Sequence, residues 1–256
     1  MRTFLSFLML AFSALALGQA PAPKTPPKVA ALSLIGDRLQ VVSAQMQTGS
    51  RIDRNRKESV ALQTDELDTA TVLGFDKRVR ALRPDLGVLL LRANDRSIHE
   101  LQDAVIAGTR DIKDLLAAVA PLAKRSGATH LVLFAKHRGE AQIQIGDGSV
   151  GTGYIEGLGF YVDRWSRPRQ TDTGIQEAGL LAPFAYYQAL LVDLDGLRVV
   201  AQESSHQARA LLPGARVTDL TDPWNYLTPA EKVETLKALS AEGLERLVPK
   251  ILQKLG

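Results

Sequence analysis

The chain has 256 residues, of which 45% are hydrophobic, and it contains no cysteine. Because 31 basic residues nearly balance 28 acidic residues, the formal charge is only +3, and no overall field favours nucleic acid as a partner. The lack of cysteine excludes disulfides, thiol catalysis and a lipoprotein-type thioether anchor. The fold must therefore be held together by its hydrophobic core alone.

The first 18 residues have the pattern of a secretory signal peptide. Arg2 carries the positive charge, residues 4–17 form an apolar stretch, and small residues ending in Gly18 provide a cleavage site. The apolar stretch is shorter than the roughly 20 residues of a transmembrane helix, which leaves an uncleaved anchor as the alternative. We therefore expect cleavage near Gly18 and a periplasmic or secreted protein.

The rest of the chain is predicted to form a tether followed by one domain. Residues 19–27 are rich in proline, which favours an extended tether that cannot pack. No later segment is apolar enough to cross a bilayer. The remaining length suits one domain. We therefore expect a single α+β domain over residues 28–256, with no transmembrane segment in the mature chain.

The start of this domain is predicted to be a pair of strands. Residues 29–35 and 39–46 are rich in β-branched and apolar residues. Gly36 and Asp37 lie between them and predict a tight turn, so we expect a hairpin. Residues 48–57 are polar and are predicted to be a loop.

Helices and buried strands are predicted to follow. A helix is expected over residues 64–83, with capping residues at its start and Pro84 after its end. Two more are expected near residues 95–106 and 110–125, where apolar residues recur at helical spacing.

Two short segments of this region are apolar at successive positions. They cover residues 87–91 and 129–135. A strand of this kind is buried on both faces, which is typical of parallel neighbours in the interior of a sheet. We therefore expect two interior strands here.

The second half is predicted to be richer in antiparallel strands. Alternating patterns predict strands over residues 141–145, 150–162, 185–194 and 197–209. Asp195 and Gly196 form a hairpin turn between the last two. A capping box with proline at the first helical position, beginning at Thr228, predicts a long C-terminal helix. The expected fold class is therefore α+β, with a mixed, largely antiparallel sheet and helices packed on it.

A glycine-rich stretch between residues 146 and 159 does not have the pattern of a phosphate-binding loop. Such a loop needs a helix directly after it, and the residues that follow are poor helix formers. In a continuous strand, Gly151, Gly153, Gly157 and Gly159 would share one face. That face either lets another element approach closely or accepts a flat ligand or partner.

The common metal-binding and catalytic motifs do not fit this sequence. The four histidines lack the spacing of a helical metal site, and residues 193–196 lack the ligand positions of an EF-hand. No GxSxG motif of a serine hydrolase occurs. We therefore expect no metal and no cofactor, and the sequence favours a non-catalytic protein over an enzyme.

Three groups of polar residues are nevertheless candidates for binding. Cationic residues end a buried strand, where α/β sheets often form a crevice. A carboxylate lies among apolar neighbours, and a basic run contains an aromatic residue. The candidate ligand- or partner-binding residues are Lys136, His137, Arg138, Glu156, Arg164, Trp165 and Arg167.

These basic residues are predicted either to bind a partner or to lie in loops exposed to solvent. The expected partners are an envelope protein or an anionic envelope component, such as lipid headgroups or glycan phosphates. Nucleic acid is not expected, because an exported protein meets little of it. The alternatives are solvated basic loops and, for residues 136–138, local ion pairing with Glu140.

Three segments together resemble a known kind of envelope domain. They are the first strand at residues 28–36, the helix-to-strand segment at 125–133 and the late hairpin at 189–200. Their order resembles the periplasmic α/β domain of curli-secretion-channel-like and TolB amino-terminal-like envelope proteins, and the whole chain is similar to exported proteins of Proteobacteria. The resemblance implies an envelope location. The chain departs from it in lacking a lipid-anchor cysteine and in the extra hairpin expected after the first strand.

Two functions remain open from sequence. One is a non-catalytic exported envelope protein that binds a partner or supports assembly. The other is a periplasmic hydrolase or small-ligand-binding protein that uses residues 136–140 and the glycine face. An enzyme should have a deep pocket with convergent polar groups, whereas a binding module should have an exposed apolar or basic patch.

Overall fold

The computed structural model describes residues 27–46, 53–166, 179–211 and 222–255. Within these ranges the chain forms an α+β fold with eleven strands, four α-helices and one 3-10 helix. The expected signal peptide and nearly all of the expected tether lie outside the described residues. No helix in the described ranges is both long and apolar enough to cross a bilayer.

The strands occur along the whole described chain. They are β1 (Lys28–Ser33), β2 (Arg38–Ser43), β3 (Arg56–Ala61), β4 (Gly87–Leu90), β5 (His130–Lys136), β6 (Arg138–Glu140), β7 (Ile143–Ile145), β8 (Gly148–Val150), β9 (Tyr154–Asp163), β10 (Leu180–Asp193) and β11 (Arg198–Ala208). The helices are α1 (Glu66–Leu82), α2 (Arg96–Ile106), α3 (Ile112–Arg125), the 3-10 helix η1 (Pro223–Tyr226) and α4 (Pro229–Leu252).

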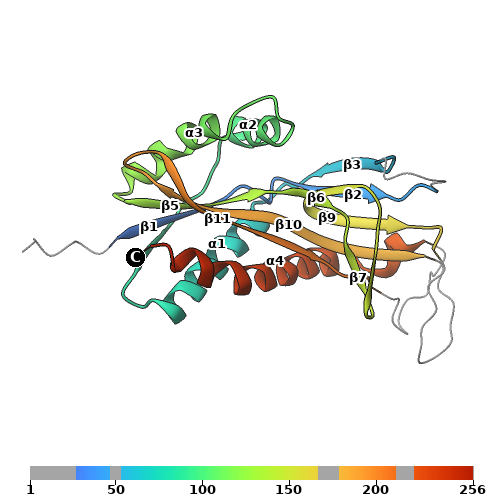
Figure 1. Cartoon of the computed structure of the whole chain (residues 1–256). Coiled ribbons are helices and arrows are strands. Elements are labelled where there is room, and N and C mark those ends of the chain that lie inside the picture. The colour runs from blue at the N-terminus through green and yellow to red at the C-terminus, as the bar shows by residue number, and fades with distance from the viewer. Residues whose placement is uncertain (1–26, 47–52, 167–178, 212–221, 256) are drawn as a thin grey trace, which may run out of the picture.

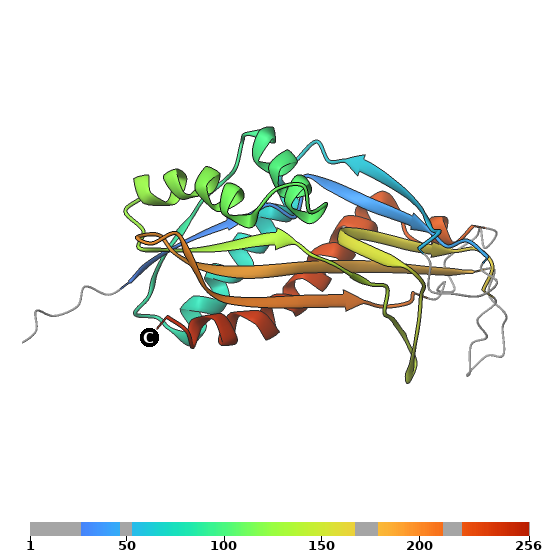
Figure 2. The ribbon, with the colours of Figure 1, turned by 45° about the horizontal axis from the view of Figure 1, so that its top comes forward.

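A long hairpin of β10 and β11 is the spine of the sheet (Figure 2). The strand order is β3-β2-β9-β10-β5-β1-β4, and β11 lies on the other edge of β10. Residues 180–186 of β10 pair with β9, and residues 187–193 pair with β5. The sheet therefore has two arms, placed end to end along one edge of β10. We call β5, β1 and β4 the parallel arm, and β9, β2 and β3 the mixed arm.

Helices cover both faces of the parallel arm (Figure 1). The side chains of Ala30 and Leu32 pack with α2 and α3, whereas those of Val29 and Ala31 pack with α1 and α4. This is why β1 is apolar at successive positions: each face has its own hydrophobic cluster. β1 runs parallel to β4 and β5, as the apolar runs predicted.

The mixed arm is covered differently. On one face lie η1 and the first half of α4. On the other, residues of β7 and its flanks pack on the strands, among them Ala141 and Ile143. The β7–β8 hairpin then extends beyond the sheet (Figure 2). No helix in the described ranges covers that face.

Several predicted elements are confirmed. The Thr228 hydroxyl accepts from the Glu231 backbone N–H, and the Glu231 side chain accepts from the Thr228 backbone N–H, which completes the capping box of α4. α1, α2, α3 and the β10–β11 hairpin form within a few residues of the predicted bounds, although β10 starts five residues earlier than predicted.

The predicted hairpin at the start of the domain is wrong. β1 pairs with β4 and β5, whereas β2 pairs with β3 and β9. β1 and β2 run in the same direction, and the segment with Gly36 and Asp37 carries the chain from one arm to the other. A Cβ on Gly36 would lie 2.8 Å from the backbone nitrogen of Asp68, so the glycine allows α1 to approach this crossover closely.

Three other strand predictions need correction. Part of the predicted 48–57 loop belongs to β3, whose six residues are all exposed, so that no burial pattern marked it. β4 is parallel to β1 as expected but is the terminal strand of the described sheet, and it is partly exposed rather than interior. The predicted strand 150–162 is interrupted before Tyr154, where Gly151 and Gly153 have positive φ.

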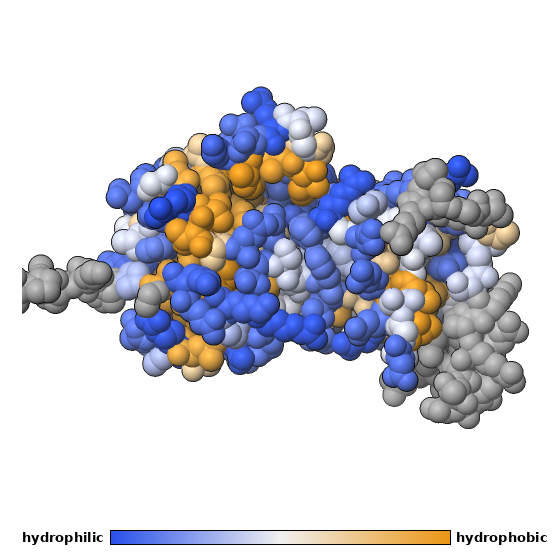
Figure 3. Space-filling model, viewed as in Figure 1, coloured by the Kyte–Doolittle hydropathy of each residue, from blue (hydrophilic) through white to orange (hydrophobic). Residues whose placement is uncertain are grey.

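One face of the surface carries a group of hydrophobic side chains. In the view of Figure 3, hydrophobic side chains gather around α2 and α3, and much of the remaining described surface is hydrophilic. Leu101, Val105, Ile112 and Leu122 are partly buried residues of these two helices.

Candidate functional site: a charged cleft at the junction of the two arms

The two arms meet where the strands of the parallel arm end. Lys136, at the end of β5, pairs with Tyr187 of β10, and Gly157 of β9 pairs with the adjacent Tyr186. The chain leaving β1 crosses the same junction at Asp37. The carboxyl ends of parallel strands are where open α/β sheets form binding crevices.

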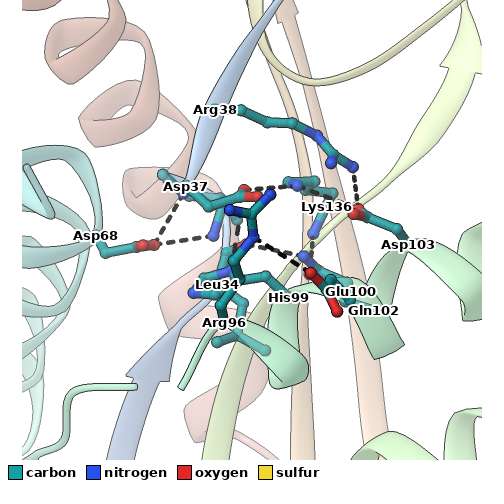
Figure 4. A network of polar contacts seen from close by, with 12 residues as sticks. Leu34, Asp37, Arg38, Asp68, Arg96, His99, Glu100, Gln102, Asp103 and Lys136 are labelled. Carbon is teal, nitrogen blue, oxygen red and sulfur yellow. Dashed lines mark hydrogen bonds and ion pairs between the residues drawn. The ribbon is translucent and has the colours of Figure 1, made fainter. Parts of the chain in front are cut away.

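Lys136 is the central charge of this junction. Its side chain is only 2% exposed, and its Nζ lies 2.6 Å from Asp37 Oδ1 and 3.3 Å from Asp103 Oδ1. Arg38 forms a second ion pair with Asp103 (Figure 4). A buried ammonium group requires such pairing, because desolvation without a counter-charge is very costly.

The backbone around Lys136 is also fixed. Its N–H donates to Gln102 Oε1 at 2.9 Å, and Gln102 Nε2 donates to the carbonyl of Leu34 at 2.9 Å. Gln102 is buried. It therefore connects α2 to the ends of both β1 and β5, and it holds Asp103, the next residue, against the lysine.

Asp68 anchors the other side of the crossover. It accepts hydrogen bonds from Ser33 Oγ at 2.5 Å and from the backbone N–H groups of Ile35 and Gly36 at 2.8 and 3.0 Å. Burial raises the pKa of this carboxyl, and the three donors oppose that shift. The first turn of α1 is thus tied to the loop that carries Asp37.

A cleft of about 310 Å³ opens between the crossover, α1 and α2. Its lining residues are Gly36, Asp37, Arg38, Ala61, Leu62, Gln63, Thr64, Asp65, Asp68, Ala93, Asn94, Arg96, His99, Glu100 and Asp103. We call it the junction cleft.

One buried nitrogen at the wall of the junction cleft lacks a hydrogen-bond partner in the described structure. It is His99 Nδ1, which lies 3.9 Å from Asp37 Oδ1. Asp37 Oδ1 is itself held by the Lys136 ammonium group at 2.6 Å. An unpaired buried polar atom costs about 1–3 kcal/mol.

Glu156 lies behind the lysine, beside a small hollow of about 50 Å³ that Arg38 also lines. Burial raises the pKa of Glu156, and the nearby Lys136 charge opposes the shift. The next residue, Gly157, has φ of +65°, and a Cβ there would lie 3.2 Å from Lys136 Cγ. The glycine therefore gives the lysine room to reach the carboxylates.

The other candidate residues from the sequence do not join this site. The ring of His137 stacks on that of His206, with centroids 4.8 Å apart, and burial together with His206 lowers the pKa of His137. The guanidinium of Arg138 lies 5.2 Å from the centre of the Tyr154 ring. Of the three successive residues 136–138, only Lys136 reaches the cleft network, and its partners are not the expected Glu140.

The basic run near residue 164 is separate as well. Arg164 forms two hydrogen bonds to Asp222, at 3.1 and 3.0 Å, and Trp165 is 58% exposed. Both residues follow the end of β9, whereas Glu156 lies near its start. Arg167 lies outside the described residues.

Sequence reasoning missed Asp37, His99 and Asp103. Two signals were available. Asp37 follows closely on the apolar strand β1, where crevice residues are common. His99 and Asp103 are four residues apart on α2 and so share one helix face.

A larger open hollow of about 520 Å³ lies between the β7–β8 hairpin, β11 and α4. His206, Arg209 and Arg246 line it. Arg209 is paired with Glu242 at 2.8 Å. Among the described residues, no group of three or more histidine or carboxylate side chains is arranged to hold a metal ion.

Comparison with known proteins reveals only distant structural similarity. No family model matches the chain, and no curated protein matches it. The PelC dodecamer from Paraburkholderia phytofirmans is 13% identical with a TM-score of 0.31, covering 90% of this chain and 87% of that one. Protein XCC0632 from Xanthomonas campestris (DUF330) is 12% identical with a TM-score of 0.34, covering 91% and 92%. The hypothetical protein CT253 from Chlamydia trachomatis is 11% identical with a TM-score of 0.32, covering 90% and 98%. Similarity at this level carries no functional inference.

Proposed function

We propose that the protein is a non-catalytic exported protein of the cell envelope that binds a small polar ligand, or the polar group of a partner, in the junction cleft. The observation that carries this proposal is the cleft itself, which lies at the carboxyl ends of the parallel strands and is lined by five carboxylates and two arginines. The cleft volume lies at the low end of the range of small-molecule sites, about 300–1,000 Å³.

The charges around Lys136 support binding rather than catalysis. A lysine that acts as a nucleophile or base must lose its proton. The ammonium group of Lys136 is instead occupied by ion pairs with two carboxylates, Asp37 and Asp103. We therefore assign Lys136 a structural role: it holds Asp37 and Asp103 in place at the cleft.

The envelope location in this proposal rests on the sequence. The signal-peptide pattern of residues 1–18 supports export, and the resemblance to envelope domains agrees with it. Amino-terminal sequencing of the protein from an envelope fraction tests this part. A mature chain that begins near Gln19 is expected, and an intact Met1 on a cytoplasmic species would contradict it.

Native mass spectrometry tests the binding part. Protein purified gently from its producing cells is expected to carry a small non-covalent adduct, which Asp37→Asn and His99→Phe lose. Asp85→Asn is the control, because Asp85 is an exposed partner of Arg83 far from the cleft lining. An adduct that persists in both cleft variants would place the ligand elsewhere.

Hydrolysis is the second candidate, and one distance favours it. His99 Nδ1 lies 3.9 Å from the Asp37 carboxylate, and a small closure would let this carboxylate orient the imidazole as a general base. A screen with ester, amide and glycoside substrates separates the candidates. Turnover that His99→Gln abolishes would favour the hydrolase, and adduct binding without turnover would favour the binding protein.

A further inference from the structure

We propose that the open edge of β11 binds an extended segment of a partner protein, which adds to the sheet as a further strand. This segment would lie in the hollow of about 520 Å³ between β11, α4 and the β7–β8 hairpin, which we call the edge groove. The edge groove shares no lining residue with the junction cleft. Binding there is therefore a second interaction, independent of the proposed function.

β11 has one edge paired and one edge open. It pairs with β10 along its length, and in Figure 2 it forms a margin of the sheet. The carbonyl of Tyr186 in β10 accepts from the N–H of His137, so Tyr186 turns its backbone groups away from β11. Its antiparallel partner His206 must then turn its own groups to the open side, because the two residues of such a pair either bond to each other or both face away.

The same alternation holds along the edge. Ser204 and Gln202 follow His206 at two-residue steps, so their N–H and C=O groups also point outward. Ala210 continues this series beyond the strand, and its N–H donates to the carbonyl of Gln144 in β7 at 2.9 Å. β7 thus uses the outward edge at that point. The outward groups of Gln202, Ser204 and His206 have no backbone partner among the described residues, and they form a template for another strand.

The composition of β11 does not protect this edge. Edge strands are commonly protected by short length, by charged residues or by proline. β4 has only four residues, and β3 has three charged residues at positions 56–58. β11 has eleven residues. Between residues 199 and 208 it contains no proline, and Glu203 is its only aspartate, glutamate, lysine or arginine. The open edge is therefore long and nearly uncharged.

The edge groove offers an added strand two different walls. On the α4 side, Leu239 is buried and apolar, whereas Arg246 is exposed and forms no ion pair with the described residues. On the hairpin side, Gln144 and Ser149 are neutral, and Asp147 likewise has no ion pair within the described part of the chain. Successive side chains of a strand point to opposite faces. One set would therefore meet α4, and the other would meet the hairpin.

These walls specify the chemistry of the bound segment. The side chains that face α4 should be apolar and include a carboxylate for Arg246. Those that face the hairpin should be small and polar and include a cation for Asp147. A second copy of β11 fits less well, because its one carboxylate, Glu203, is already paired with Lys250 of α4 at 3.2 Å.

An NMR titration of the whole chain with a peptide tests the proposal. The probe is acetylated and amidated Thr-Val-Thr-Glu-Thr-Val-Lys, in which threonine and lysine alternate with valine and glutamate. It is expected to shift the amide signals of residues 202–208 and to slow their hydrogen exchange. The signals of residues 36–38 in the junction cleft should not change.

Two N-methylated forms of the peptide test strand addition directly. One carries methyl groups on the first, third, fifth and seventh residues, and the other on the intervening residues. In a strand, alternate N–H groups point to the same neighbour. One of the two forms is therefore expected to lose binding, and the other is expected to keep it. A peptide held by its side chains alone would lose or keep binding in both forms, which would overturn strand addition.

Variants of the chain separate the contribution of the edge from that of the charge. Ser204→Pro removes one outward N–H and is expected to abolish peptide binding while the chain still folds, because proline is tolerated where an edge N–H faces solvent. Arg246→Glu is expected to weaken binding at least tenfold, and a peptide with lysine in place of glutamate should restore it. Lys113→Glu makes the same charge change at an exposed position of α3 and should leave binding unchanged.

The remaining outcomes decide who occupies the edge. Unchanged binding by Ser204→Pro, or no binding of the unmethylated peptide to the wild-type chain, would contradict the proposal. If the signals of residues 202–208 shift when the protein is concentrated without peptide, a second copy takes the edge and the assignment to a partner is wrong. The two methylated peptides are compared on the wild-type chain, so that test stands even if Ser204→Pro fails to fold.

Discussion

The parallel arm and the mixed arm share one long hairpin, but they are stabilised in different ways. Helices seal both faces of β1 and β5, and these strands are buried almost throughout. In the mixed arm, β3 is fully exposed, and one face is covered by strands and loops instead of helices. The charged network lies where the two kinds of cover meet. In this protein the buried ion pairs therefore lie at the boundary between the two arms, where the ends of the parallel strands are not fully covered by either arm.

A glycine substitution in each arm gives the largest expected contrast. In the mixed arm, a Cβ on Gly159 would clash with the backbone carbonyl of Gln40 in β2 and would lie 2.7 Å from the Phe184 ring. Gly159→Val is expected to lower the free energy of unfolding by about 3 kcal/mol or more, at the upper end of overpacking effects. Urea denaturation measures this change.

The matched control lies on the edge of the parallel arm. No atom lies within 4 Å of a Cβ added to Gly87 in β4. Gly87→Val is therefore expected to leave the stability unchanged or to raise it slightly, because valine favours strands. Equal losses for the two variants would show that the arms do not differ as described.

The junction itself is tested by removing its central charge. Lys136→Met leaves Asp37 and Asp103 facing each other without their shared cation. Breaking a buried ion pair costs about 3–5 kcal/mol, and the partial exposure of both carboxylates reduces the expected loss to about 2–3 kcal/mol.

A double variant sharpens this test. If Lys136→Met acts through the stranded carboxylates, adding Asp37→Asn should cost less than it does in the wild-type background. Additive effects in the chemical denaturation curves would argue against the coupling. Arg80→Met, which breaks an exposed pair with Asp76 on α1, should change the stability much less than Lys136→Met does, because solvent screens an exposed ion pair.

Substitutions at Gly157 test how closely β9 of the mixed arm packs on Lys136 of the parallel arm. The four glycines do not share one strand face as predicted, because Gly151 and Gly153 lie before β9 and Gly157 has φ of +65°. A Cβ on Gly157 would contact the Lys136 side chain, which agrees with the predicted close approach of another element. Gly157→Val is expected to destabilise by about 1–2 kcal/mol through backbone strain. Gly157→Asn should cost less, because asparagine tolerates this conformation. If valine were as stable as asparagine in thermal unfolding, strain would not be the cause.

The smallest expected effect is the pH dependence of Glu156. Burial raises its pKa above the ordinary value of 4.5, so the folded state holds the proton more tightly than the unfolded state. The contribution is favourable at acidic pH and is lost as the pH rises through the folded pKa. Glu156→Gln should therefore be more stable than wild type at about pH 8, and this advantage should shrink towards about pH 4. Denaturation at both pH values checks the trend, and an advantage that grows on acidification would contradict it.

Local signals in the sequence determined the helices and the type of several strands. Thr228 and Glu231 form a capping box within one turn, Asp111 caps α3 through the N–H of Lys113, and Asp195 and Gly196 form a turn between adjacent strands. Each of these signals acts over a few residues, so it can be read without knowledge of the rest of the fold. Successive apolar residues likewise predicted that β5 is buried on both faces.

Only the tertiary structure decided which strands pair and which polar residues meet. β1 and β2 are neighbours in sequence and look like a hairpin, yet they join different arms: β1 pairs with β4 and β5, and β2 pairs with β3 and β9. Asp37, His99 and Lys136 come from three segments that are distant in the sequence. No local sequence pattern indicates that their side chains meet. Their meeting depends on the register of β5 against β10 and on the packing of α2 over the strand ends, because a buried charge is stable only where the whole fold delivers its counter-charge.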